Sequence, residues 1–153
     1  MLKLASMKNS DLLMIKAAQV KARITVDEPA KLSTKNVKLA LRFEYSGEGE
    51  REYQFVLQLL NMSEKIESGF WLSNPITRHE YDFKVADNSL GEFRKYQREF
   101  VKYGKPKKYY WTVYYYLEKR PVKGEPVNLD LELKLSKADD YFYLLKGVEL
   151  GVN

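Results

Sequence analysis

The chain has 153 residues and a formal net charge of +5, a length that suits one domain with its own hydrophobic core. The chain has no cysteine, so disulfides, thiol catalysis and cysteine-ligated zinc are excluded. It has one histidine, His79, so a metal site with several histidines is excluded as well. The longest strictly apolar run near the N-terminus is 12–15, too short for a signal peptide or a membrane span. We therefore expect a soluble, cytoplasmic protein that does not bind membranes. Abundant Lys, Glu and Tyr with few Gln also fits the composition of a thermophile's protein.

The first half of the chain is dominated by alternating apolar and polar residues, the pattern of strands with one buried face. After residues 1–10, interpreted as a flexible N-terminal arm, the segment 16–26 predicts a long first strand. Residues 36–60 predict a hairpin, because two alternating runs flank the glycine-containing sequence SGEGE. GFWLS (69–73) and HEYDFKV (79–85) predict shorter strands.

The period then changes to that of a helix. Leu90, Phe93, Phe100 and Val101 recur at intervals of three and four, so we expect an amphipathic helix over 90–103. Ser89 followed by Glu92 is the pattern of a capping box, and Gly104 with Pro106 provides a stop.

Two strands around the sequence RPVKGEP predict a second hairpin over 109–136, and YFYLLKGVEL (141–150) predicts a final strand. The leucines at 129, 131, 133 and 135 and the apolar residues at 37, 39, 41 and 43 should face one core, because each set is the only apolar face of its strand. The whole chain, 1–153, is thus expected to be a single mainly β domain of about eight strands. An antiparallel β-sandwich is favoured, and the alternative is an OB-like barrel with an extra hairpin at 65–85.

The positive charge is concentrated in one segment. Residues 94–108 carry a formal charge of +6, because their only acid is Glu99, and the rest of the chain sums to −1. Arg94, Arg98 and Lys102 should form an outward stripe on the helix, with Lys95 beside it. Lys105, Lys107 and Lys108 then lead directly into an aromatic strand.

The aromatic strand places different residues on its two faces. Tyr109, Trp111, Val113, Tyr115 and Leu117 form one face, which is typical of a core. Tyr110, Thr112, Tyr114 and Tyr116 form the other, where three phenols are unusual for a face outside the core. Aromatic rings that stack bases, with cations that hold phosphates, predict binding of single-stranded nucleic acid without sequence preference.

Two other interpretations of the tyrosine face stay open. The apolar side of the helix could pack on it as a second core, since tyrosine also favours strands. Alternatively, the face could be an interface in a homo-oligomer or with another protein, because Tyr, Trp and Arg are enriched at interface anchors.

Signals for catalysis are weaker. Asp130, Glu132 and Lys134 share a strand face, and Asp82 precedes Lys84 by two residues, a spacing used by Mg²⁺-dependent nucleases. Alternating charge on a solvated strand explains both more simply. His79 has no nucleophile marked near it and is interpreted as a packed or edge histidine. We therefore expect a non-enzymatic protein with no metal and no cofactor.

Overall fold

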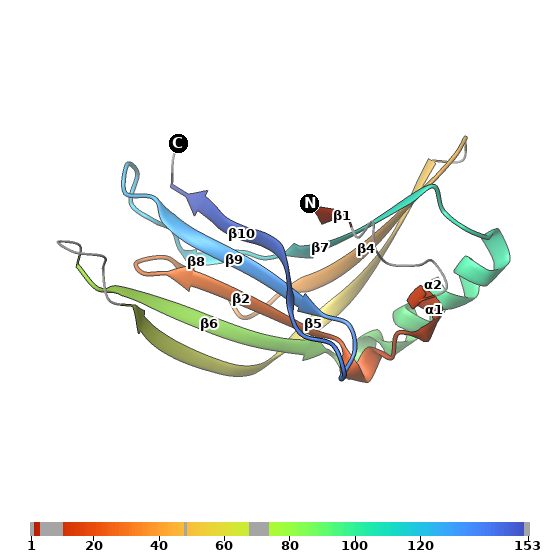
Figure 1. Ribbon diagram of the computed structural model, residues 1–153, viewed down its shortest axis with the longest axis horizontal. Coiled ribbons are helices and arrows are strands. Elements are labelled where there is room, and N and C mark those ends of the chain that lie inside the picture. Colours follow the sequence, from red (N-terminus) through yellow and green to blue (C-terminus); the bar gives the residue numbers. More distant parts are fainter. Residues whose placement is uncertain (1, 4–10, 48, 68–73, 152–153) are drawn as a thin grey trace.

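The computed structural model describes residues 2–3, 11–47, 49–67 and 74–151 (Figure 1). Its helical elements are α1 (Asp11–Met14), the 3-10 turns η1 (Ala17–Gln19) and η2 (Asp87–Ser89), and α2 (Leu90–Tyr103). Its strands are β1 (Leu2–Lys3), β2 (Lys21–Asp27), β3 (Lys31–Leu32), β4 (Lys38–Tyr45), β5 (Gly49–Glu67), β6 (Ile76–Val85), β7 (Lys108–Tyr114), β8 (Leu117–Lys119), β9 (Val127–Lys134) and β10 (Phe142–Leu150). No helix among these described ranges has the length and apolarity needed to cross a membrane.

The main sheet has eight antiparallel strands in the order β1-β7-β4-β5-β6-β2-β9-β10, and it curls until it is nearly closed into a barrel (Figure 1). The long strand β5 joins its two halves. The first part of β5 pairs with β4 and the later part with β6, with a bulge between Leu59 and Asn61. The predicted antiparallel β domain with one short helix is confirmed, and the single curled sheet is closer to the barrel alternative.

One core fills the concave side of the sheet. The two predicted apolar sets lie in the same buried cluster, which confirms that they share a core: Val37, Leu39, Leu41 and Phe43 from the β4 region, and Leu129, Leu131, Leu133 and Leu135 from the β9 region. In β9 the core residues Leu129, Leu131 and Leu133 occupy every second position, as a strand with one face on the core requires.

The helix α2 covers one end of this core over the predicted residues. Phe93 and Phe100 pack on the aromatic side chains of β4 and β5, with 5.0 Å between the ring centroids of Phe93 and Phe55 and 5.8 Å between those of Phe100 and Phe43. The predicted capping box is wrong: the Ser89 hydroxyl makes no capping bond and instead accepts the backbone N–H of Val56 at 2.8 Å. This hydrogen bond connects the residue before the helix to β5.

The first predicted hairpin is confirmed and the second is wrong. β4 and β5 pair across a turn in which Gly47 and Gly49 have positive φ angles of 77° and 81°, a conformation that glycine adopts without strain. β7 and β9 do not pair, because β7 lies between β1 and β4 whereas β9 lies between β2 and β10. The segment between β7 and β9 contains β8, which pairs with β3 and carries the chain to the other part of the sheet.

The remaining strand predictions differ in their bounds. The first strand begins at Lys21, because residues 17–19 form the 3-10 turn η1. The extra hairpin predicted at 65–85 is present as β5 and β6, which pair as far as Glu67 and Ile76. The strand predicted at 69–73 and residues 4–10 of the predicted N-terminal arm lie outside the described residues.

Candidate nucleic-acid interface

The two faces of β7 are those that the alternation predicts. Tyr109, Trp111 and Val113 are buried in the core, and Trp111 is fully enclosed. Tyr110 and Tyr114 lie half-buried on the outer face. Tyr116, two residues beyond the end of β7, is 62% exposed. The tyrosines of the outer face are therefore not a second core beneath the helix, and Tyr116 presents most of its ring to solvent.

Tyr110 and Tyr114 are held by acids on neighbouring strands. The Tyr114 hydroxyl donates to Glu52 at 2.7 Å, and Tyr110 makes a long contact of 3.4 Å with Glu44. The hydrogen bond to Glu52 and partial burial raise the pKa of Tyr114 above its usual value. These carboxylates weaken attraction for phosphate around Tyr110, because like charges repel.

Three side chains donate hydrogen bonds to the carboxylate of Glu52. It accepts bonds from Arg42 at 3.1 Å and Gln54 at 2.9 Å, in addition to the bond from Tyr114. Partial burial alone would raise the pKa of Glu52, but the bonds from Tyr114, Gln54 and Arg42 lower it overall. The Tyr114 ring is consequently fixed in position on the outer face.

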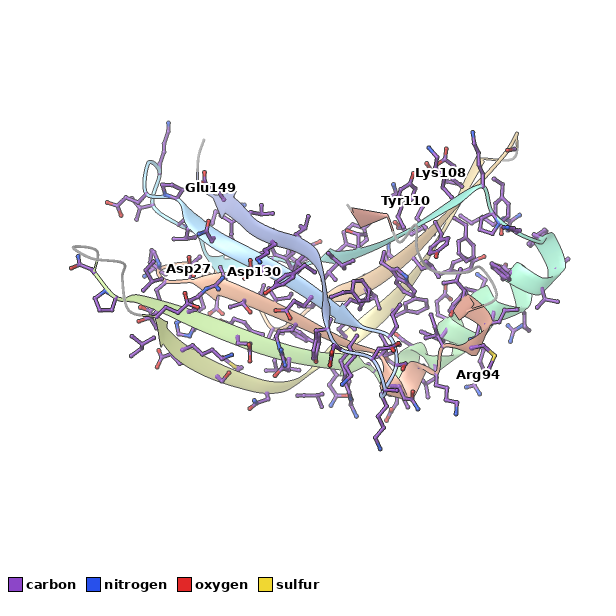
Figure 2. The ribbon with its side chains drawn as sticks, viewed as in Figure 1. Asp27, Arg94, Lys108, Tyr110, Asp130 and Glu149 are labelled. Carbon is purple, nitrogen blue, oxygen red and sulfur yellow. The ribbon has the colours of Figure 1, made fainter. Side chains whose placement is uncertain are left out.

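The basic stripe of the helix lies on the opposite side of the sheet from these tyrosines. All four cations of the stripe are exposed, as predicted: Arg94, Lys95, Arg98 and Lys102. However, α2 packs on the inner face of β4 and β5, whereas Tyr110 and Tyr114 project from the outer face of β7. In Figure 2 Arg94 lies on the lower side of the molecule, and Tyr110 and Lys108 lie on the upper side. The sheet thus separates the two groups that the sequence places side by side.

The only ring placed beside a cation of the stripe, among the described residues, is that of Tyr103, which is 40% exposed and lies 5.2 Å from Nζ of Lys102 at the end of the helix. A shallow hollow beside the stripe is lined, among the described residues, by Leu13, Arg94, Gln97, Arg98 and Val101. It offers cations and aliphatic surface without an aromatic face.

The three lysines after the helix lie between the two surfaces along the chain. Lys105 and Lys107 are exposed, and Lys108 is half-buried opposite Glu44 in the strand register. Tyr114 lies six positions after Lys108 along β7, roughly 20 Å away at the usual rise per residue. These lysines are therefore at the helical end of β7, whereas Tyr116 is beyond its other end.

Tyr116 stands between two hollows at that other end. One hollow, of about 370 Å³, is lined by Tyr114, Tyr116, Asn36, Lys38 and Gln54. The other, of about 460 Å³, is lined by Tyr115, Tyr116, Leu117, Arg120, Pro121, Lys123, Glu149, Leu150 and Gly151. Cationic side chains therefore line the hollows on both sides of Tyr116. Lys38 belongs to β4, and Arg120 and Lys123 belong to the segment after β8, so none of them is part of the helix.

One wall of the larger hollow is formed where two segments that are distant in the sequence contact each other. Gly124 donates its backbone N–H to the carbonyl oxygen of Gly151 at 3.3 Å, which brings the turn at 121–124 to the end of β10. A Cβ atom on Gly151 would lie 2.9 Å from Cγ of Pro121, so only glycine fits there without a shift. The backbone of Tyr116 is held by a further hydrogen bond, in which the backbone N–H of Ser33 donates to the Tyr116 carbonyl oxygen at 2.8 Å.

The acids considered for a nuclease are held by arginines. Arg78 donates to Asp130 at 2.9 Å and to Asp27 at 2.7 Å, and both aspartates are buried (Figure 2). The second oxygen of Asp130 accepts the backbone N–H of Gly147 at 2.6 Å. Both oxygens of Asp130 are therefore engaged in holding the sheet together.

A second arginine lies among the other acids of this face. Arg23 donates to Asp82 at 2.8 Å and lies 3.6 Å from Glu80 and 3.9 Å from Glu132. Burial, together with repulsion from Glu80 and Asp130, raises the pKa of Glu132 despite the nearby guanidinium. The Arg23 guanidinium thus lies among the carboxylates of Asp82, Glu80 and Glu132.

Comparisons with protein-family models, with curated proteins and with solved structures found no match for this chain.

Sequence reasoning missed Lys38, Arg120 and Lys123 as partners of the tyrosines. Their residue types carried no signal, because single lysines and arginines on strands and turns are common on any protein surface. Only the proximity of the start of β4 and of the segment after β8 to Tyr116 identifies them.

Proposed function

We propose that this protein binds single-stranded nucleic acid, without catalysing a reaction on it, at a surface centred on Tyr116. The observation that carries this proposal is the exposed ring of Tyr116 between two hollows lined by Lys38 on one side and by Arg120 and Lys123 on the other. A base stacked on such a ring gains about 1–3 kcal/mol, and the neighbouring cations attract phosphates.

The charges at the surface favour an anion. Lys38, Arg120 and Lys123 contribute three positive charges to the lining of the two hollows, and Glu149 contributes one negative charge. Stacking and contacts to phosphate carry little sequence information, so we expect binding that tolerates many sequences. Single strands are favoured over duplexes because the bases of a duplex are already stacked on one another.

The test measures fluorescence anisotropy of a labelled single-stranded oligonucleotide of mixed sequence at several salt concentrations. Tyr116→Ala should weaken binding by about 1–3 kcal/mol, roughly 5- to 150-fold, and leave the salt dependence nearly unchanged. The double variant Arg120→Gln and Lys123→Gln should reduce the slope of log K against log salt by about 1.4, since each single-strand phosphate contact contributes about 0.7.

Matched controls separate this surface from the helix. Tyr143→Ala removes a part-exposed tyrosine from β10 and should leave affinity unchanged. Arg94→Gln with Arg98→Gln removes two exposed helix cations and should leave the salt slope unchanged. If the helix variant flattens the slope and the Arg120 and Lys123 variant does not, the nucleic acid lies on α2. Absence of salt-dependent binding by the wild type refutes the proposal.

Self-association is a second candidate function, favoured by a separate observation. The strands β5 and β6 carry large exposed apolar side chains: Leu60, Met62, Ile66 and Ile76. Met62 and Ile66 share one face of β5, whereas the register places Ile76 on the other face. Exposed apolar residues that share a face often mark a contact with another protein chain. Sedimentation velocity over a range of concentrations tests this function. A dimer that dissociates on Ile66→Glu while oligonucleotide binding is absent would favour assembly over nucleic-acid binding.

A further inference from the structure

Three potential metal ligands converge at the end of the sheet remote from α2. They are Glu28, just after β2, Glu64 in β5 and His79 in β6. The Nε2 atom of His79 lies 2.8 Å from an Oε1 atom of Glu28 and 3.9 Å from an Oε1 atom of Glu64. One ligand atom from each residue lies within 4.8 Å of the other two.

The sheet holds all three positions. Glu64 is directly opposite His79 in the pairing of β5 with β6, and His79 is opposite Val26 in the pairing of β6 with β2. Glu28 follows β2 by one residue, and its backbone N–H donates to the carbonyl oxygen of Thr77 at 2.9 Å. Backbone hydrogen bonds of three separate segments therefore set the spacing of the three side chains.

The charges of this group are not balanced by a lysine or an arginine. Within the described part of the chain, Glu28 and Glu64 form ion pairs only with His79. The nearest cations along the strands, Lys65 and Arg78, pair instead with acids on the other face of the sheet. Two carboxylates that share one imidazole repel each other, and a bound cation relieves this repulsion.

The donor atoms select the class of cation. One imidazole nitrogen with two carboxylate oxygens suits Zn²⁺ and similar transition-series ions, whereas Mg²⁺ and Ca²⁺ prefer oxygen alone. Bonds of 2.0–2.2 Å in a tetrahedral site place neighbouring ligand atoms about 3.4 Å apart. The distances of 2.8 and 3.9 Å from His79 bracket this value, so small rotations of the two glutamates are enough.

We propose that Glu28, Glu64 and His79 bind one divalent transition-metal ion, with water in the remaining coordination position. Both glutamates are more than half exposed, at 51% and 59% of their side chains, which leaves a path for the ion. His79 is less exposed, at 25%, and provides the fixed nitrogen.

The bound ion would act as a structural link. Beyond Leu59, almost every side chain of β5 is exposed, so this part of β5 is held mainly by its pairing with β6. A metal bonded to Glu64 and Glu28 connects it to the end of β2 as well. Binding to the folded state alone raises stability in proportion to the logarithm of the free ion concentration.

The test uses the untagged full-length protein, stripped with a chelator, because a histidine tag would itself bind the probe ions. Isothermal titration with Zn²⁺ should show one ion per chain, and Zn²⁺ should raise the melting temperature whereas Mg²⁺ at the same concentration should not. Hydrogen exchange at residues 60–67 should slow when Zn²⁺ is added. Failure of all three measurements with wild type overturns the proposal.

Substitution of the proposed ligands, compared with substitution of a nearby carboxylate, tests which side chains bind the ion. His79→Gln and Glu64→Gln should each weaken Zn²⁺ binding at least tenfold and abolish the slowed exchange, while melting in the presence of chelator shows whether each variant is folded. Glu67→Gln removes an exposed carboxylate from the same strand, near Arg78, and should leave binding unchanged. Stoichiometric binding that survives His79→Gln, or that is lost equally in Glu67→Gln, would overturn the assignment. If a variant does not fold, His79→Cys, which keeps a zinc ligand, should restore binding; failure to do so counts against the site.

Discussion

Replacing Arg78 by Met should destabilise the protein strongly, because it leaves two buried carboxylates without their cation. Asp27 and Asp130 are only 6% and 8% exposed, and Arg78 bonds both, at 2.7 and 2.9 Å. Removing one partner from a buried ion pair typically costs about 3–5 kcal/mol. Both aspartates also accept backbone N–H groups, from Asn128 and Gly147, so they cannot turn away without breaking a second bond.

Urea denaturation followed by the fluorescence of the buried Trp111 would measure this loss.

A matched control and a rescue complete this prediction. Arg94→Met removes an exposed arginine and should cost less than about 0.5 kcal/mol. Asp27→Asn with Asp130→Asn in the Arg78→Met background should recover part of the loss, because the amide oxygens can still accept the two backbone N–H groups without a buried charge. A loss below about 1 kcal/mol in Arg78→Met would show that the two buried aspartates do not depend on this cation.

Leu131→Ala should lower the free energy of unfolding by about 2–5 kcal/mol in urea, since Leu131 is buried in the shared core and its truncation leaves a cavity; a cost under half a kilocalorie would contradict this burial. Incubation of the protein with Mg²⁺ or Mn²⁺ and single-stranded or duplex substrate should give no cleavage, because both oxygens of Asp130 are already bonded within the sheet. Cleavage that Asp130→Asn abolishes would restore the nuclease hypothesis. Stability should fall as the pH rises above about 10, because burial raises the folded-state pKa of Tyr53 and Tyr96 and only the unfolded chain then ionises at that pH. Tyr96→Phe should make this decline shallower, and a decline of the same steepness in wild type and variant would show that Tyr96 ionises equally in both states.

The sequence alone determined most of the residues that face the core, but on the helix the predicted Val101 is 70% exposed and the fully buried Tyr96 was missed. Period-two alternation placed Leu39 and Leu131 inside, and intervals of three and four gave the helix over 90–103 with both of its ends. These features follow from local geometry, because the direction of a side chain depends only on the backbone conformation of its own segment. The division of β7 into a buried and an outer face was predictable for the same reason.

Which strands lie next to each other was decided by the tertiary structure. The aromatic strand and the leucine strand follow each other in the sequence and resemble a hairpin, but each found other partners through long-range hydrogen bonds. The apolar pattern of a strand does not specify its neighbour, because any strand with a complementary face and a free edge can pair with it.

The candidate sites depend on the same non-local pairing. Arg98 and Tyr114 are sixteen positions apart in the chain, yet the helix packs on the inner face of the sheet and Tyr114 projects from the outer face. Conversely, Glu28, Glu64 and His79 converge only because β6 pairs with both β2 and β5. The sequence determined the chemical character of each face through local periodicity, and only the sheet order, set by long-range hydrogen bonds and burial of one common core, decided which faces meet.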